Sequence, residues 1–491
     1  MGYDVRAIIG GEWISGAERG DNINPANTDE VLGTYPKLGR DHTLEAINAA
    51  QNAFPAWRAT PAPKRADILF EALALLDERR DEIAAALCRE EGKILPESKG
   101  EVQKAYNVLE FIAGEGRRLN GETIPSEIPG TFAYTVRQPH GVVGIITPWN
   151  FPVAIPIWKI APALVCGNTV VFKPASLTPW TGELVTRLFV DAGLPAGVLN
   201  YVTGSGGKVG DVLVNDPRVR ALSFTGSNEV GTKLYTDAAK RNAAVQCEMG
   251  GKNPIVVLDD ADIELAAVAT AQGAFGSTGQ RCTATSRAIV MESVADHYVE
   301  LVVEHAKAVV AGDGMDPKTT MGPSVDESQM NTVIEYFAIG KKDGATLKCG
   351  GERLTADALG KGFFVAPTVF DNVDQSMRIA KEEIFGPVLS VIRVKDLDEA
   401  LAVANDVDYG LSSSVYTRDV GRIFEFVDKI ETGITHVNSP TMGGEAQLPF
   451  GGVKATGVGH REQGKTAIEF YSELKTVYID FTGKARTSKV Y

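Results

Sequence analysis

A cysteine in a stretch of small residues is the first candidate for chemistry in this sequence. Cys282 lies within GAFGSTGQRCTATSR, residues 273–287, where glycine, serine and threonine surround the thiol. Such residues leave a thiol approachable and let the backbone come close to a bound molecule. Only the thiolate form of a cysteine is nucleophilic, so the environment decides whether Cys282 reacts. On its own, the pattern more often marks a cysteine that packs as a small hydrophobic side chain.

Two further polar residues stand where they could assist a nucleophile. Glu248 follows a strand-like run in CEMGGKNP, and a carboxylate at the carboxyl end of a strand can face a cleft. Burial there would raise its pKa and make it a usable general base. Asn150, in TPWNF, could donate a hydrogen bond to a developing oxyanion. The alternatives are a surface turn for Glu248 and a helix N-cap for Asn150.

Two glycine turns favour a ligand that contains phosphate. FTGSNEVG, residues 224–231, is typical of a strand, a turn and the start of a helix. Gly226 and Gly231 would let the backbone approach a phosphate at that helix N-terminus. A second turn, GSGG at 204–207, is expected at the same edge of the sheet. Neither turn is GxGxxG, so each alone is a weak signal, and the two together favour a dinucleotide.

Two charged residues could contact the sugars of such a ligand. Lys173 ends the run VVFK and could bind a ribose hydroxyl or a phosphate, although it could also simply cap the sheet. Glu383, in KEEIFGPV, could accept hydrogen bonds from ribose hydroxyls, although an acidic pair usually lies in a solvated turn.

The elements that would position these residues follow an α/β pattern. Between about residues 140 and 250, short β-branched runs alternate with helical segments through glycine turns, which indicates βαβ units around a parallel sheet. A second α/β series begins at residue 254. Other segments are predicted as helices at 43–57, 62–91 and 101–120, and as strands at 131–140, 363–370 and 476–481.

Length and charge bound the class of protein. A chain of 491 residues is expected to form two or three domains. The net charge of −14 argues against a nucleic-acid partner or an anionic membrane surface. Five widely spaced cysteines without a CxxC support neither a disulfide framework nor a metal site, and they fit a reducing compartment such as the cytoplasm. The apolar stretch 141–172 contains four prolines and therefore predicts strand, helix and strand rather than a membrane span.

Seven motifs together resemble the aldehyde dehydrogenase superfamily over nearly the whole chain. TPWNF, VVFKPAS, FTGSNEVG, EMGGKNP, FGSTGQRC, EEIFGPV and LPFGGVK occur in the family's order and spacing. The resemblance implies that Cys282 is the nucleophile and Glu248 the general base, and that Asn150 helps to form the oxyanion hole. It also implies hydrolysis of a thioester rather than transfer to coenzyme A, because the acylating branch typically lacks the glutamate. A catalytically silent relative is the rival from another class.

The resemblance implies the contacts of cofactor and substrate as well. The cofactor-binding residues would be Ile146, Trp149, Lys173, Ser176, Gly226, Ser227, Gly231, Glu383 and Phe385. The substrate residues would be Phe151, Trp158, Arg281 and Phe450, the aromatic ones with plain core packing as the alternative.

Two departures from the family pattern bear on specificity. Strictly NAD-preferring members often carry a glutamate where this chain has Ser176, so we expect NADP to be accepted as well as NAD. Arg281, directly before the nucleophile, could hold a substrate carboxylate or lie in an outward-facing salt bridge. GQRCTATSR and the segment 436–452 look most like the branch that includes α-ketoglutaric semialdehyde dehydrogenases. An oxo-acid semialdehyde is therefore the favoured substrate, with succinic semialdehyde, aliphatic and aromatic aldehydes as alternatives.

The resemblance also sets the expected fold: a Rossmann-like cofactor domain, an α/β catalytic domain and a small β arm for oligomerisation. The predicted ranges are 1–126 and 147–253 for the cofactor domain, 254–465 for the catalytic domain, and 127–146 with 466–491 for the arm. A homodimer or homotetramer is expected, with the strands near 131–140 and 476–481 bridging subunits.

Overall fold

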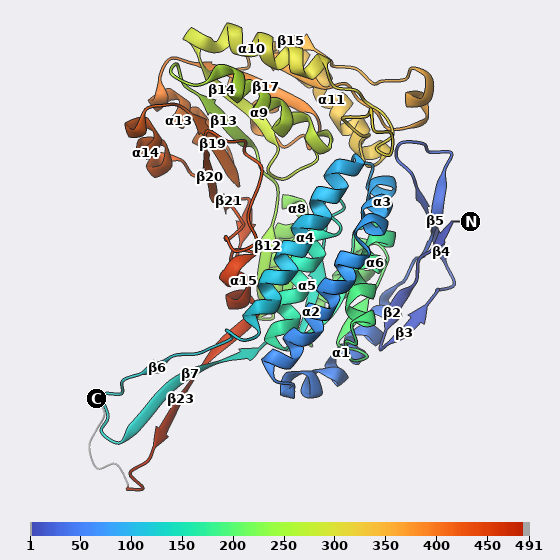
Figure 1. The fold of residues 1–491 in the computed structure, drawn as a ribbon, viewed down its shortest axis with the longest axis vertical. Helices are drawn as coiled ribbons and strands as arrows, with labels where there is room; N and C mark the ends of the chain where they lie inside the picture. The colour runs from blue at the N-terminus through green and yellow to red at the C-terminus, as the bar shows by residue number, and fades with distance from the viewer. Residues whose placement is uncertain (1, 485–491) are drawn as a thin grey trace.

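Two α/β units and a projecting β arm make up the protein, as a computed structural model that describes residues 2–484 shows (Figure 1). One unit is built on an eight-stranded sheet and the other on a seven-stranded sheet. The arm extends from the side of the first unit, away from the second. The predicted α/β fold with an additional β arm is confirmed.

The first unit has five parallel strands at the centre of its sheet. In sheet order the strands are β22 (Gly457–Val458), β12 (Ala244–Glu248), β11 (Val219–Thr225), β8 (Val142–Ile146), β9 (Thr169–Lys173), β10 (Leu199–Tyr201), β2 (Ala7–Ile9) and β3 (Glu12–Ile14). The chain runs from β8 through β9 to β10 on one side and returns to β11 on the other. The strand order therefore reverses at β8, and ligands bind at the carboxyl ends of the strands at such a point.

Helices cover both faces of this sheet. They are α1 (Arg40–Ala59), α2 (Ala62–Glu78), α3 (Arg80–Glu91), α4 (Leu95–Glu115), α5 (Ala154–Cys166), α6 (Pro179–Asp191), α7 (Asp211–Asn215) and α8 (Asn228–Ala239). A small sheet of β1 (Tyr3–Asp4), β5 (Val31–Pro36) and β4 (Arg19–Ile23) lies at the edge. The stretch 141–172 forms β8, α5 and β9, as predicted, and every residue of α5 is buried because it packs between α4 and the sheet. Between residues 2 and 484, no helix is both long and apolar enough to cross a membrane.

The second unit is a seven-stranded sheet between two apolar layers. In sheet order its strands are β15 (Thr346–Cys349), β16 (Thr368–Asp371), β17 (Val388–Val394), β14 (Thr285–Met291), β13 (Asn253–Val257), β19 (Ser412–Tyr416) and β20 (Ile434–Val437), of which only β15 is antiparallel. Its helices are α9 (Ile263–Phe275), α10 (Glu292–Lys307), α11 (Glu327–Asp343), α12 (Arg378–Lys381), α13 (Leu397–Asn405) and α14 (Val420–Lys429).

The arm is a three-stranded antiparallel sheet. It contains β23 (Ser472–Asp480), β7 (Thr131–Pro139) and β6 (Thr123–Ile124), and β23 pairs with β7 along nine residues of each strand. The predicted arm segments were too long at their inner ends. β8, inside the predicted segment 127–146, pairs with β9 and β11 in the eight-stranded sheet. α15 (Gly464–Phe470), which overlaps the predicted segment 466–491, packs on α5 because its apolar side chains complete that core.

Two predicted elements also end elsewhere in the structure. The helix predicted for 101–120 ends at Glu115. It begins already at Leu95, because Pro96 suits the first turn of a helix. The strand predicted for 363–370 is a strand only from Thr368 onward. Residues 363–365 are apolar because they pack into the core rather than because they pair in the sheet.

Candidate active site

A strained turn between the two units presents Cys282. After α9, the short helix η2 (Gly276–Gly279) contains Ser277 and Thr278 with φ of 49° and 59°, a left-handed conformation that non-glycine residues rarely adopt. The turn is held from outside, because the Ser277 amide donates to Glu97 Oε1 at 2.8 Å and the Thr278 hydroxyl to the Gly322 carbonyl at 2.9 Å. Such strain persists only where surrounding structure enforces it, and it is common at active sites.

Cys282 and Asn150 meet at one cavity of about 220 Å³. Asn150 is buried, and its Nδ2 donates a hydrogen bond to the Gln280 carbonyl oxygen at 2.9 Å, two residues before the cysteine. The side-chain amide of Asn150 is therefore bonded to the segment that carries Cys282, at the cavity that both residues line. Asn150 is not a helix N-cap, since α5 begins at Ala154 with Val153 as its cap.

The environment of Cys282 disfavours its thiolate form. Burial, together with the like charges of Glu383 and Glu248, raises the pKa of the thiol to about 12. A positive charge or a base brought beside the sulfur would reverse this effect.

Glu248 lies at the end of β12, as predicted, but its carboxyl group turns toward the segment 450–452. A Cβ at Gly451 would lie 2.3 Å from Glu248 Oε1, so glycine is required there to leave room for the carboxyl group. Burial and the like charge of Glu462 raise the pKa of Glu248 well above its usual range. Glu248 does not line the cavity that holds Cys282, and its Oε2 has no hydrogen-bond partner within the described residues.

A buried ion pair adjoins Glu248. Lys159 of α5 forms an ion pair with Glu462 and donates to the Ser223 hydroxyl at 2.8 Å. Both charged side chains are at most 2% exposed, so the amine and the two carboxyl groups interact in a medium of low dielectric.

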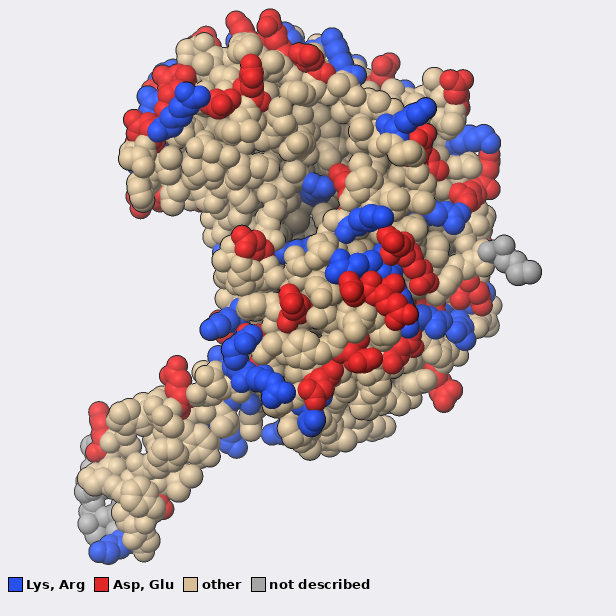
Figure 2. All heavy atoms as spheres, in the orientation of Figure 1, with Lys and Arg blue, Asp and Glu red and all other residues tan. Residues whose placement is uncertain are grey.

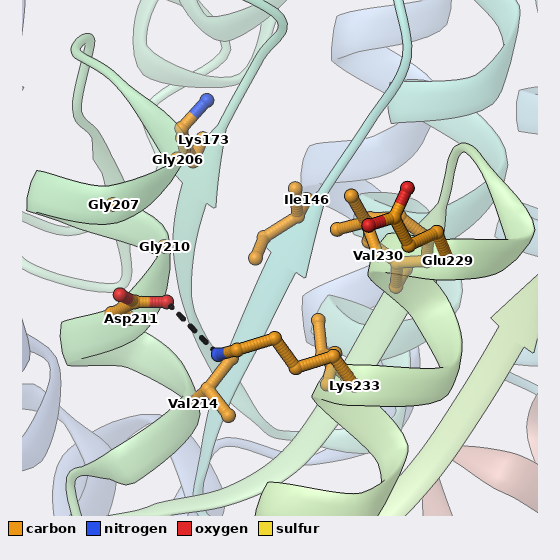
Figure 3. Close-up of a pocket in the computed structure, with 12 residues that line it drawn as sticks. Ile146, Lys173, Gly206, Gly207, Gly210, Asp211, Val214, Glu229, Val230 and Lys233 are labelled. Atoms are coloured by element: carbon orange, nitrogen blue, oxygen red, sulfur yellow. Dashed lines mark ion pairs between the residues drawn. The ribbon is translucent and has the colours of Figure 1, made fainter.

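A larger cavity of about 460 Å³ lies at the point where the strand order reverses (Figure 3). Ile146 ends β8 and Lys173 ends β9. Across the cavity they face the short helix η1 (Gly206–Gly210), which follows the start of the glycine turn, and the helices α7 and α8. The lining residues that were not predicted as site residues from the sequence are Gly210, Asp211, Val214, Phe224, Glu229, Val230, Lys233 and Leu234. Within α8, the apolar Val230 departs from the mostly polar pattern of the exposed face. The structure shows this side chain half exposed at the cavity.

The predicted cofactor residues divide between the two cavities. Ile146 and Lys173 line the larger cavity, whereas the residues that line the cavity of Cys282 are Trp149, Gly226, Ser227, Glu383 and Phe385. Ser176 adjoins the glycine turn through a hydrogen bond from its hydroxyl to the Gly204 carbonyl at 3.2 Å. Gly231 lines neither cavity; a Cβ there would lie 2.5 Å from Met249 Sδ, so this glycine serves close packing between α8 and β12.

The chemistry of these residues fits a dinucleotide. Lys173 is buried, its amine donates to the Pro174 carbonyl at 2.7 Å and to no other group among residues 2–484, and burial lowers its pKa to about 8. Glu383 accepts from the Gly251 amide at 2.9 Å, and burial raises its pKa to about 7. Both side chains keep hydrogen-bonding capacity for ribose hydroxyls, and Gly250 is required beside Glu383 because a Cβ would lie 2.0 Å from its Oε2. Gln329, which the sequence did not single out, donates to the carbonyls of Ile384 and Phe385 at 3.0 Å and so fixes this segment.

None of the four predicted substrate residues lines the cavity that holds Cys282. Trp158 and Phe450 pack with ring centroids 5.5 Å apart. The Phe151 ring lies under the Lys93 amine, with the nitrogen 4.2 Å from the ring centroid. Arg281 pairs with Glu97 at 3.0 Å and donates to the Ser277 hydroxyl at 3.0 Å. The charge of Arg281 is therefore already neutralised by the protein.

Known proteins are similar to this chain in sequence and in fold. The family model described as "Aldehyde dehydrogenase family" matches residues 13–477. An α-ketoglutaric semialdehyde dehydrogenase of Bacillus subtilis is 45% identical over 96% of this chain and 97% of its own. A succinate-semialdehyde dehydrogenase [NADP(+)] of Escherichia coli is 41% identical over 97% of this chain and 98% of its own. The crystal structure of a betaine aldehyde dehydrogenase from Staphylococcus aureus in complex with NAD+ superposes with a TM-score of 0.96 at 36% identity, covering 98% of this chain and 96% of that one. The chain belongs to the aldehyde dehydrogenase family.

Proposed function

We propose that this aldehyde dehydrogenase oxidises a short oxo-acid semialdehyde, of the α-ketoglutaric semialdehyde type, to the corresponding dicarboxylic acid. The observation that carries the proposal is the meeting of Cys282 and Asn150 at one cavity, with seven of the nine predicted cofactor residues on the same cavity and the next. The substrate class is supported by relatives named for this semialdehyde, at 45% and 46% identity over 96% of the chain.

The first chemical step adds the thiolate of Cys282 to the aldehyde carbon. The resulting thiohemiacetal carries an oxyanion, which the Asn150 amide and the Cys282 backbone N–H stabilise; one such donor typically contributes about 3–4 kcal/mol. When bound, the nicotinamide supplies the acceptor for the hydride that leaves the aldehyde carbon. The carbon is thereby oxidised by two electrons and remains on Cys282 as a thioester.

The second step hydrolyses the thioester. Glu248 removes a proton from water, the hydroxide adds to the acyl carbon, and the carbon–sulfur bond breaks to release the acid and restore Cys282. For this step the Glu248 carboxyl group changes rotamer from Gly451 toward the cavity. Lys159 and Glu462 adjoin Glu248 and are well placed to influence its protonation state.

Absorbance of the reduced cofactor tests the activity. The wild type is expected to reduce NAD+ or NADP+ with α-ketoglutaric semialdehyde at a higher kcat/KM than with succinic semialdehyde, an aliphatic aldehyde or an aromatic aldehyde. Cys282→Ala is expected to abolish the signal. A signal that depends on added coenzyme A would favour an acylating enzyme, and the absence of any cysteine-dependent signal would favour a silent relative.

Use of NADP as well as NAD is part of the proposal. Ser176 is uncharged and lies beside the glycine turn, so nothing at this position repels a 2′-phosphate. Ser176→Glu is expected to raise the KM for NADP+ at least tenfold with little effect on the KM for NAD+. Unchanged use of NADP+ by this variant would contradict the assignment.

A further inference from the structure

Lys104 of α4 is a half-buried amine without a carboxylate partner. Its Nζ donates to the Gly444 carbonyl at 2.5 Å and to Gln463 Oε1 at 2.8 Å. Within residues 2–484 it forms no ion pair, and the acid that acts on it most is the exposed Glu445. Burial lowers the pKa of Lys104 to about 8. Buried cations normally have an anion beside them, so this arrangement is incomplete.

The position of Lys104 on α4 places it alongside the active site. Glu97, Glu101 and Lys104 follow one another at helical spacing and therefore share a face of α4. Glu97 holds Arg281, the residue before the nucleophile, and Glu101 accepts from the amides of Val153 and Ala154 at 2.8 and 3.1 Å. Lys104 lies two helical turns, roughly 10 Å, beyond Glu97 along this face.

The groups around Lys104 connect it to the aromatic pair of the predicted substrate tunnel. A Cβ at Gly444 would lie 3.8 Å from the Phe450 ring, so the carbonyl that accepts from Lys104 adjoins that ring. Phe450 also exchanges two backbone hydrogen bonds of 2.7 Å with Glu462, which directly precedes Gln463. Phe450 packs on Trp158, so Lys104 is connected to this aromatic pair through its hydrogen bonds to Gly444 and Gln463.

Two buried donors beside this aromatic pair lack an acceptor, and one buried acceptor, Glu462 Oε2, lacks a donor within the described residues. Gln463 Nε2 and Trp158 Nε1 are buried and have no hydrogen-bond acceptor in the part of the chain that is described. A buried donor without an acceptor costs about 1–3 kcal/mol, so such donors point to an acceptor that arrives with a ligand. Figure 2 shows the surface hollowed where the seven-stranded unit meets the helices of the other unit, with basic side chains on its rim.

We propose that Lys104 and Gln463 form the subsite for the distal carboxylate of the substrate. A cation and neighbouring N–H donors are the groups that bind a carboxylate, and in this position they accept the end of a short chain whose aldehyde reaches Cys282. Arg281, whose charge is paired with Glu97, instead fixes the turn that carries the nucleophile. This assignment rests on the proposed function, because it requires a substrate with a second acidic group.

The ratio of two specificity constants tests the subsite. The kcat/KM for glutaric semialdehyde is divided by that for pentanal, which has the same length without the charge. In Lys104→Met this ratio is expected to fall about 10- to 100-fold, the range for loss of a charge-assisted hydrogen bond, mainly through a higher KM for the acid. Lys104→Arg is expected to restore part of the ratio. Lys99→Met is the matched control, since Lys99 is an exposed lysine of the same helix that pairs with Asp81 at 2.9 Å.

Each outcome separates the subsite from the function. A ratio in Lys104→Met equal to that of the wild type overturns the subsite while the proposed function stands. A wild type that shows no preference for the charged aldehyde overturns the proposed function, and the subsite with it. If the methionine variant does not fold, Lys104→Gln, which keeps a donor near Gly444 without the charge, replaces it in the same comparison, and its ratio is expected to fall in the same way.

Discussion

The surroundings of Cys282 oppose formation of its thiolate. The residue is half-buried, and burial with the like charges of Glu383 and Glu248 raises the pKa of its thiol to about 12. A raised pKa lowers the thiolate fraction at every pH below it. A positively charged nicotinamide beside the sulfur would act in the opposite direction, so we expect the reactivity of Cys282 to depend on cofactor binding.

Alkylation rates test this coupling. In the free enzyme, the rate of Cys282 modification by iodoacetamide is expected to rise about tenfold per pH unit from pH 7 to 9, because the thiolate fraction grows with pH throughout this range. Saturating NAD(P)+ is expected to raise the rate at pH 7. Peptide mass spectrometry measures the rate, and the half-buried Cys349 is the internal control. A rate that levels off below pH 8 without cofactor would contradict the raised pKa.

At the residue scale, the sequence predicted which residues meet but not where every side chain points. Cys282 and Asn150 are 132 positions apart, and the motifs were sufficient to bring them to one cavity. The direction of Arg281 was left open, because its partner Glu97 lies 184 residues away in an unrelated segment. The orientation of Glu248 likewise depends on Gly451, whose missing side chain makes the space.

Buried charged residues at the start of helix α4 bind segments of the candidate active site. Lys93, just before the helix, donates to the Asn150 carbonyl at 2.6 Å and to Glu101 at 2.7 Å. The side chains of Lys93 and Glu101 are at most 1% exposed. The backbone that carries Asn150, for which we propose the role of oxyanion donor, is thus bonded directly to a buried ion pair.

Removal of the amine at position 93 tests whether this pair positions Asn150. Lys93→Met leaves Glu101 as an unpaired buried charge and is expected to destabilise the protein by about 3–5 kcal/mol. In the folded fraction kcat is expected to fall, and the double variant with Asn150→Ala is expected to lose little more than Asn150→Ala alone. Thermal unfolding and kcat measure the two effects, with the exposed Lys64→Met as control. Strictly additive losses would show that Lys93 does not act through Asn150.

At the element scale, periodicity predicted most helices and strands, and buried charge explains the main error. The helix predicted for 101–120 starts after the observed helix, which begins at Leu95, because the charged residues before Glu101 gave no apolar signal. In the structure, Glu97 pairs with Arg281, and Glu101 accepts hydrogen bonds from the turn before α5. Both contacts are to other segments of the chain, so no pattern within the helix could indicate them.

Within residues 2–484, no other element covers the exposed apolar side chains of the arm. β7 and β23 pair along nine residues, and several large apolar side chains on them are exposed, namely Phe132, Leu474, Tyr478, Ile479 and the adjoining Phe481. An exposed apolar patch of this kind on a projecting sheet marks an interaction surface. We expect the arm to pack against a second copy of the chain and to form a dimer or a dimer of dimers.

Truncation before β23 tests the role of the arm. A chain that ends at Tyr471 is expected to lose the larger assembly and to run as a smaller species in light scattering coupled to size exclusion. The substitution pair Leu474→Lys and Ile479→Lys, which keeps the strand and changes its apolar face, is expected to act in the same direction. An assembly of unchanged mass in both would show that subunits meet elsewhere.

Trapping the acyl-enzyme tests the central claim most directly. With Glu248→Gln, NAD(P)+ and the semialdehyde, we predict a burst of about one reduced cofactor per chain, followed by slow turnover, because hydride transfer needs Cys282 whereas hydrolysis needs the carboxylate. Mass spectrometry of the quenched protein is expected to find the acyl group on the peptide that contains Cys282. Steady turnover at the wild-type rate, or an acyl group on another residue, would contradict the account.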